Sequence, residues 1–383
     1  MQEKKLQNTL KDIKLVNHAC FSFYHGDAGC LVDPWFEGSI FNNSWKLVSE
    51  GGQAPDNLKY IFISHEHPDH LHWPTLSKLA SSEVTVVLCQ RNNDNVEINL
   101  KRLGYNVLSL PNQTKHNLDG LTVEFFRSGH DHAIVFEQNG FVMVNQNDCQ
   151  LQESTARALK DKYPEIDVWW MQFSLAGYYG NLDDKQKLVD AQKQHKNMFS
   201  SYQAILQPRI SVPFASFVNF CREENKELND YRVRLEDILE DNSGVQILYN
   251  GDSLLDADYE VRNLSNVRKW EESFEASIEL ETPTSSREEF EEVFREFCSK
   301  HQAQGQLQFE LFDDVGCVLN MAEGSCEFKK PAAPIAKVHL FDLREMFKNP
   351  WGADTLNITS CFHVYNEEAW RYLLLAVDSL YTR

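Results

Sequence analysis

The segment 65–70 reads His-Glu-His-Pro-Asp-His and places four potential metal ligands in one short stretch. His65 and His67 can direct their imidazoles at one metal ion. Asp69 and His70 can face a second ion nearby. A polar surface loop could hold such residues by chance, but four ligand types directly after an apolar run favour a metal site. The segment therefore predicts a dinuclear metal centre in which Asp69 also takes part in catalysis.

Two later segments offer further donors, which one loop alone cannot supply. We expect His130, in Gly-His-Asp-His at 129–132, to complete the first metal's ligands, with His132 as an alternative or supporting residue. Asp148, in the segment NQNDC, is expected to bridge the two ions and take part in catalysis. An ordinary Asx turn is the alternative for Asp148.

Two residues elsewhere are weaker candidates. His18, in VNHACF, either lines the pocket from the first hairpin or is only a turn residue. Arg209, in LQPRI, either binds an anionic substrate through its fork-shaped guanidinium or pairs with one of the many carboxylates. The sequence leaves both alternatives open.

The elements around these residues predict a mixed α/β protein. The apolar strand 59–64 ends directly at His65, so the histidine-rich loop leaves the carboxyl end of a strand, where α/β sheets place their sites. The other expected elements are two strands over 13–33 that meet at 25–27, alternating strands and helices over 84–111, a hairpin series to about 147, helices at 153–161 and 183–204, and a buried strand at 166–171.

The character of the chain changes beyond about residue 256. An acidic helix is expected at 286–300, short strands at 306–311, 316–320 and 337–341, and a closing amphipathic helix at 366–381. We therefore expect a catalytic domain over residues 1–255 and an α+β extension over residues 256–383.

The composition excludes several classes of protein. With 57 acidic against 37 basic residues and a formal net charge of −20, attraction to nucleic acid or anionic membranes is unfavourable. The longest apolar runs are strand-sized, and the N-terminus lacks the apolar stretch of a secretory signal. Nine cysteines without framework spacing favour reduced thiols. We expect a cytoplasmic protein that acts on a small molecule.

The segment 61–80, IFISHEHPDHLHWPTLSKLA, resembles the metal-loop signature of the metallo-β-lactamase superfamily. Segments 30–45, 144–149, 205–217 and 342–370 resemble successive parts of the CMP-N-acetylneuraminate hydroxylase family in the same order. The resemblance implies an αββα sandwich with an appended C-terminal α+β region. It also implies two metal ions held by His65, His67, Asp69, His70, His130 and Asp148.

Two features depart from this resemblance. Hydrolases of the superfamily usually carry a late histidine after a strand-ending proline, but residues 212–216 read Val-Pro-Phe-Ala-Ser. Either another residue or solvent then completes the second metal's ligands, or that metal is more open. His195 is the nearest later histidine, but its Lys- and Gln-rich surroundings favour a solvated helix face. A Rieske cluster is not encoded, since Cys361-Phe362-His363 has no Cys-x-x-His partner.

Two reactions fit these residues. The resemblance favours a diiron oxygenase that hydroxylates a small organic substrate with dioxygen and electrons from a separate donor. The alternative is a metal-dependent hydrolase that cleaves a phosphodiester, lactone or amide with a metal-bridging hydroxide. Imidazole and carboxylate ligands suit iron, zinc and manganese, so the ligand types alone do not select the metal.

Overall fold

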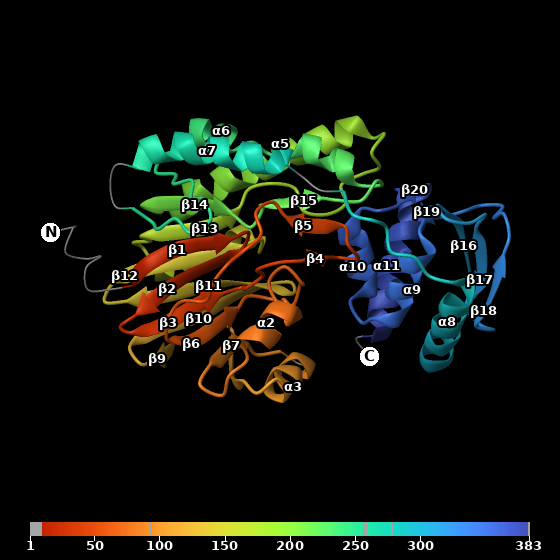
Figure 1. Cartoon of the computed structure of the whole chain (residues 1–383), viewed down its shortest axis with the longest axis horizontal. Helices are drawn as coiled ribbons and strands as arrows, with labels where there is room; N and C mark the ends of the chain where they lie inside the picture. Colours follow the sequence, from red (N-terminus) through yellow and green to blue (C-terminus); the bar gives the residue numbers. More distant parts are fainter. Residues whose placement is uncertain (1–9, 92–93, 256–258, 277–278, 382–383) are drawn as a thin grey trace.

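Two six-stranded sheets form the first part of the chain (Figure 1). The computed structural model describes residues 10–91, 94–255, 259–276 and 279–381. The first sheet contains, in spatial order, β1 (Lys11–Asn17), β2 (Cys20–His25), β3 (Ala28–Val32), β6 (Leu58–Ile63), β7 (Thr85–Cys89) and β8 (Asn106–Leu110). The second contains β14 (Ile210–Phe214), β13 (Val168–Gln172), β12 (Phe141–Asn147), β11 (Asp131–Gln138), β10 (Leu121–Ser128) and β9 (His116–Leu118).

Aromatic side chains fill the space between the two sheets. Phe21 of the first sheet stacks on Trp170 of the second with ring centroids 4.6 Å apart. Phe23 and Phe62 both contact Phe136, at 5.1 and 4.9 Å. Because strand side chains alternate between faces, these rings share the inner face of their sheets and form one continuous core.

Helices cover the outer faces of both sheets. Leu76 of α2 (Trp73–Leu79) and Leu100 of α3 (Asn95–Arg102) pack on the first sheet. Phe199 of α5 (Lys185–Leu206) contacts Trp169 of the second sheet at 4.9 Å. The remaining helices of this part are α4 (Glu153–Lys162), the short 3-10 helix η1 (Lys226–Tyr231), α6 (Leu235–Asp241) and α7 (Tyr259–Glu275). The predicted αββα sandwich is thus confirmed.

The C-terminal part has a hydrophobic core of its own. Its sheet contains β18 (Ser325–Phe328), β17 (Cys317–Asn320), β16 (Gln306–Leu311), β19 (Ala336–Val338) and β20 (His363–Val364). Its helices are α8 (Arg287–His301), α9 (Leu340–Lys348), α10 (Gly352–Thr359) and α11 (Glu367–Tyr381). The first core extends to Phe274 and the second begins at Phe290. The change of core therefore lies between Phe274 and Phe290, so α7 packs with the first part, and the division into domains at residues 255 and 256 stays a prediction.

Buried polar contacts join the two parts of the chain. Arg222 and Asp342 are both fully buried, and their side chains form an ion pair of 2.9 Å. The His339 Nε2 atom lies 2.6 Å from a carboxylate oxygen of Glu224. The amide of Asn181 bonds both the backbone N–H and the carbonyl of Val364. These contacts bring α10 and α11 against the end of the sandwich, beside a three-stranded sheet of β4 (Ser39–Ile40), β5 (Trp45–Leu47) and β15 (Val218–Phe220) (Figure 1).

Two predicted elements differ from the structure. The segment 13–33 forms three strands rather than two, because a tight turn at His18 and Ala19 pairs Asn17 with Cys20. His18 has a φ of +24° in this turn. The predicted strand 337–341 ends at Val338, since His339 precedes the first residue of α9.

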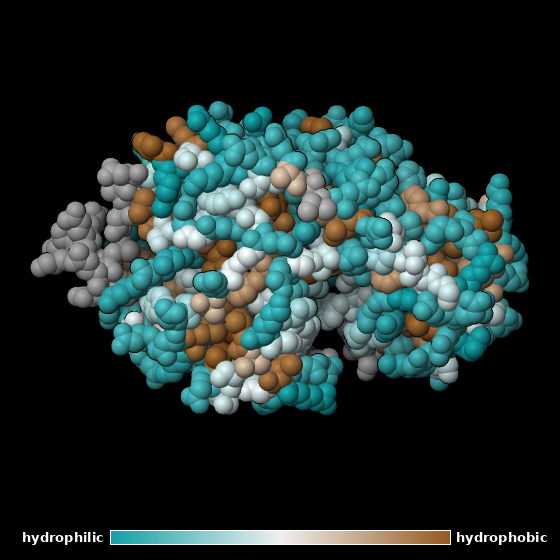
Figure 2. Space-filling view, in the orientation of Figure 1, coloured by the Kyte–Doolittle hydropathy of each residue, from teal (hydrophilic) through white to brown (hydrophobic). Residues whose placement is uncertain are grey.

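The surface matches the acidic composition. Figure 2 shows hydrophilic residues over most of the visible face. Within the described residues, no helix has the length and apolar content needed to cross a bilayer.

Candidate metal centre

The histidine-rich loop leaves the carboxyl end of β6, as predicted. Its backbone turns back on itself, since the N–H groups of His70 and Leu71 both donate to the carbonyl of His67. Asp148 directly follows β12, and Asp131 opens the antiparallel neighbour β11. The end of one antiparallel strand and the start of the next lie at the same edge of a sheet, so both carboxylates reach the loop.

The donor atoms gather in two clusters. In the first, His65 Nε2 lies 2.9 Å from His67 Nδ1 and 3.8 Å from Asp131 Oδ1. In the second, Asp69 Oδ2 lies 3.2 Å from His70 Nε2 and 3.3 Å from His18 Nε2. Ligand atoms held about 2.1 Å from one ion in tetrahedral or octahedral geometry lie about 3.0 to 3.4 Å apart. The separations in both clusters are close to this spacing.

Asp148 lies between the two clusters. Its Oδ2 atom is 3.6 Å from His65 Nε2, and its Oδ1 atom is 3.4 Å from His70 Nε2. One carboxylate oxygen thus faces each cluster. This is the arrangement that a bridging carboxylate requires.

Several buried atoms of the site have no hydrogen-bond partner among the described residues. They include Asp69 Oδ1, His70 Nε2 and Asp148 Oδ1. A buried polar atom without a partner costs about 1 to 3 kcal/mol, and more when it is charged. A cation bound between these atoms would satisfy all of them. The donor set therefore fits metal ions.

The carboxylates of the site have strongly shifted pKa values. Burial opposes ionisation of Asp69, but the rings of His70 and His18 outweigh it and hold the Asp69 pKa well below its usual value. The Asp148 pKa is likewise lowered, because His65 and His70 overcome the effect of burial. Burial and the neighbouring Asp148 raise the pKa of Asp131 to about 7. Asp69 and Asp148 are thus ionised at neutral pH, ready to hold cations.

Asp33 orients the second cluster from behind. It is fully buried, follows β3, and accepts hydrogen bonds from the Ser64 N–H at 2.8 Å and the Ser64 hydroxyl at 2.7 Å. His70 Nδ1 donates to the same carboxylate at 3.0 Å, which leaves Nε2 free to face a metal. Asp33 was not among the predicted site residues, although an Asp-Pro pair directly after a buried strand could have indicated a site residue.

Asp354 reaches the first cluster from the C-terminal part. His67 Nε2 donates to Asp354 Oδ2 at 2.8 Å, across 287 residues of chain. This bond directs His67 Nδ1 toward His65. No local pattern around Asp354 marks it as a site residue, because only the packing of α10 brings it there.

His130, predicted as a ligand, lies outside both clusters. Its ring is exposed and contacts Trp351 at a centroid distance of 5.5 Å. The turn before β11 directs His130 outward, and the next residue, Asp131, faces inward instead. His132 is buried and donates from Nδ1 to the carbonyl of Ser64 at 3.0 Å, next to His65. His132 thus lies beside the metal-binding loop in the position of a supporting residue, one of the two roles considered for it.

His18 and Arg209, the two weaker candidates, lie in different parts of the structure. His18 belongs to the second cluster, and its carbonyl accepts from the N–H of Ala215. It thus comes from the first hairpin to lie beside the segment where the late histidine was expected. Arg209 precedes β14 at the strand's opposite end, where its Nε lies 3.7 Å from Asp167. Arg209 therefore lies outside both clusters and does not line the cleft.

His195 does not lie on a solvated helix face, and that prediction was wrong. It is buried on the face of α5 that packs inward, and its Nε2 is hydrogen-bonded to the Tyr179 hydroxyl at 2.8 Å. The Lys and Gln residues around it occupy the other faces of the helix. Burial lowers the pKa of His195 to about 4, so its ring is neutral.

A cleft of about 320 Å³ opens over the donors of both clusters. His67, Asp69, Asp131, Asp148 and Asp354 reach it, and its other walls are Phe41, Trp45, Ser128, Gly129, Gln150, Gln172, Ala176, Tyr179 and Ile358. The cleft combines apolar walls with ionised donors. A small organic molecule fits such a site.

Comparisons with known proteins agree with the topology. Residues 12–152 match the β-lactamase superfamily domain. The cytidine monophosphate-N-acetylneuraminic acid hydroxylase of Macaca mulatta is 28% identical over 264 residues, which cover 61% of this chain and 43% of that protein. The hydroxylase of Danio rerio is 25% identical over 243 residues, covering 57% and 40%. The match thus spans less than half of the length of these two relatives.

Two solved structures are also similar. The diiron β-hydroxylase CmlA of Streptomyces venezuelae is 13% identical, with a TM-score of 0.46, over 63% of this chain and 53% of that one. A possible metal-dependent hydrolase of Veillonella parvula is 11% identical, with a TM-score of 0.45, over 64% and 99%. The sandwich topology and the match of residues 12–152 thus make this part of the chain similar to the β-lactamase superfamily domain, and the chain is also similar to the cytidine monophosphate-N-acetylneuraminic acid hydroxylases.

Proposed function

We propose that the chain is a dinuclear iron oxygenase that hydroxylates a small organic substrate. The observation that carries this proposal is the make-up of the two clusters. Each combines two imidazoles with one carboxylate, and Asp148 lies between them. Two histidines and one carboxylate with open positions form the facial triad of mononuclear non-haem iron oxygenases, and each of the two clusters contains this set.

The proposed ligands come from four parts of the fold. His65, His67 and Asp131 would hold the first ion, and His18, Asp69 and His70 would hold the second. Asp148, whose two oxygens face His65 and His70, would help to hold both ions. When bound, the metal pair supplies the activation of dioxygen, with electrons from a separate donor protein.

The surrounding residues prepare the cleft for this chemistry. Asp33 and Asp354 fix the orientation of His70 and His67 by accepting their outer N–H groups. Phe41 and Trp45 line the cleft and exclude water from the reacting part of the substrate. The relatives named as hydroxylases support the same reaction class.

Anaerobic loading with ferrous iron tests the proposal. We expect two iron ions per chain, and oxygen consumption after chemical reduction that is lost when Asp148 is changed to Ala. A surface variant, Asp119→Ala, provides the matched control, since Asp119 pairs with the exposed Lys59 far from the cleft. Stoichiometric zinc or manganese after native purification, with no oxygen consumption by the iron form, would refute the proposal.

A metal-dependent hydrolase is the second candidate. The position of Asp69 favours it, because a carboxylate buried beside His18 and His70 could orient an attacking water when metal ions are bound. In that case a panel of phosphodiester, lactone and amide substrates should reveal turnover that a chelator abolishes. Hydrolysis without oxygen consumption would select this candidate over the oxygenase.

A further inference from the structure

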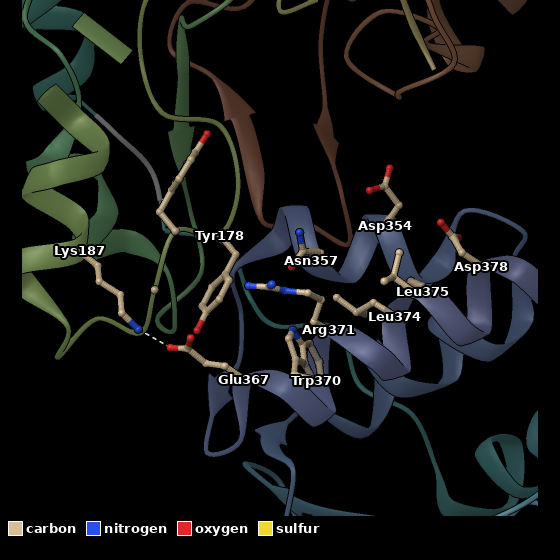
Figure 3. Close-up of a pocket in the computed structure, with 13 residues that line it drawn as sticks. Tyr178, Lys187, Asp354, Asn357, Glu367, Trp370, Arg371, Leu374, Leu375 and Asp378 are labelled. Atoms are coloured by element: carbon tan, nitrogen blue, oxygen red, sulfur yellow. Dashed lines mark hydrogen bonds and ion pairs between the residues drawn. The ribbon is translucent and has the colours of Figure 1, made fainter. Parts of the chain in front are cut away.

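A second cavity opens beside the metal cleft and shares two walls with it. It has a volume of about 430 Å³ and lies between the segment 178–187, α10 and α11 (Figure 3). Tyr179 and Asp354 line both this cavity and the metal cleft. We call it the junction cavity, because it lies between the sandwich and the C-terminal part. A molecule bound there lies next to the candidate metal centre.

Three polar side chains of the junction cavity have no hydrogen-bond or ion-pair partner among the described residues. They are Asn357 of α10 and Trp370 and Arg371 of α11. The indole nitrogen of Trp370 is buried, and the residue is 3% exposed. In Figure 3 the Arg371 side chain extends from α11 between Tyr178 and Asn357. Three groups that can donate hydrogen bonds thus line one cavity without a partner.

Arg371 differs from the other cation of the junction cavity. Lys187 is ion-paired with Glu367 and Asp184 (Figure 3). Its charge is therefore neutralised within the chain. The guanidinium of Arg371 is the cation that remains available to a ligand in this part of the described structure.

These groups define the chemistry of a ligand. A guanidinium offers a planar fork of donors that matches a carboxylate or a phosphate, and an indole N–H can only donate. An amide adds a further donor. Tyr178 and Leu374 give the cavity apolar walls. Asp354 and Asp378 lie at the other end of the cavity in Figure 3, where they repel an anion and so direct its charged group toward Arg371.

We propose that the junction cavity anchors an anionic group of the substrate, a carboxylate or a phosphate, on Arg371, Asn357 and Trp370. The rest of the substrate passes Tyr179 and Asp354 to reach the metal cleft. This assignment rests on the proposed function, since it takes the metal cleft as the place of reaction. The substrate class is an organic anion whose reacting carbon lies away from its charged group. The formal net charge of −20 repels anions at long range, and a local cation such as Arg371 would offset that repulsion.

Anion binding to the full chain tests the anchor without relying on activity. Phenyl phosphate, phenylacetate and the neutral phenylacetamide are titrated calorimetrically into the chelator-treated chain, so that no anion can bind a metal. We expect at least one anion to bind saturably, and Arg371→Gln to weaken it by about 10-fold or more, as for the loss of a charged hydrogen bond. Phenylacetamide should bind both proteins equally weakly. The control is Arg157→Gln, since Arg157 is exposed on α4 and pairs with Glu153.

The outcomes separate this anchor from the proposed function. A preference for phenyl phosphate or for phenylacetate identifies the anionic group, and both results support the anchor. Saturable binding that Arg371→Gln leaves unchanged overturns it, as does the failure of both anions to bind. Metal content is measured on untreated samples of the same proteins. Metal binding without anion binding overturns the anchor alone, whereas anion binding by a chain that takes up no metal overturns the proposed function alone.

Discussion

Replacing Asp33 with Asn should weaken binding at the second cluster while leaving the fold intact. All three groups around this carboxylate donate to it, namely the N–H and the hydroxyl of Ser64 and the Nδ1–H of His70. An amide has one oxygen and one N–H₂ group. In either orientation, the amide N–H₂ group therefore points at a group that also donates.

The less costly orientation places the new amide nitrogen near His70 and the Ser64 hydroxyl, because the hydroxyl can rotate and accept. His70 must then accept at Nδ1 and carry its proton on Nε2, the atom that faces Asp69 and Asp148. That proton has to leave before a metal binds. Loss of such a supporting partner typically weakens metal affinity about 10- to 100-fold, or about 1.4 to 2.7 kcal/mol.

The assay is a competition titration with a chelator of known affinity, followed by elemental analysis at each point. We expect Asp33→Asn to lose one of the two ions at a lower chelator concentration than the wild-type chain. Asp119→Asn is the matched control, since Asp119 is 63% exposed at its side chain and pairs with Lys59. Circular dichroism checks that both variants are folded. Two ions bound with wild-type affinity by folded Asp33→Asn would refute the role assigned to Asp33.

Three further perturbations test the rest of the structure. Asp342→Ala removes one of the two carboxylates that pair with the buried Arg222, the other being Glu224, and should lower the free energy of unfolding by about 3 kcal/mol in urea titrations; a loss under 1 kcal/mol would contradict the buried pair. Chelation should lower the thermal midpoint, because ions held at 100 times their dissociation constant add about 2.7 kcal/mol to the folded state; a midpoint unaffected by chelator and by added metal argues against ligation. Burial opposes protonation of His339, but hydrogen bonds to Asp313 and Glu224 raise its pKa to about 9. The stabilising contribution of protonated His339 is therefore complete below about pH 6.5 and lost as the pH rises through 9. His339→Gln should lower the free energy of unfolding more at pH 6 than at pH 10. Equal losses at both pH values would contradict the pKa shift.

The sequence pattern predicted most of the elements that position the site. The strand before His65, the alternating elements over 84–111 and the long helix that forms α5 follow from apolar periodicity and turn residues, which act over short distances. The turn at His18 was not predicted, because the residues on both sides of it have a composition typical of strands.

The site itself was predicted less completely. The histidine-rich loop and Asp148 are adjacent to strand ends, and the structure brings their side chains together. Around residue 130 the pattern Gly-His-Asp-His offered three ligand types in a row, and the direction of each depends on where the turn ends and β11 begins. Boundaries of this kind are uncertain by a few residues, which is enough to exchange His130 for Asp131.

By itself, the sequence determined that one loop at the end of a buried strand carries donors for two metal ions, because those donors are close in the chain and their spacing is read directly. Only the tertiary structure decided which distant residues join them. His18 arrives because the first hairpin lies beside the segment after β14. Asp354 arrives because α10 packs across the end of the sandwich. Such contacts depend on the packing of whole elements, and no local pattern in the chain encodes the direction in which a distant side chain will point.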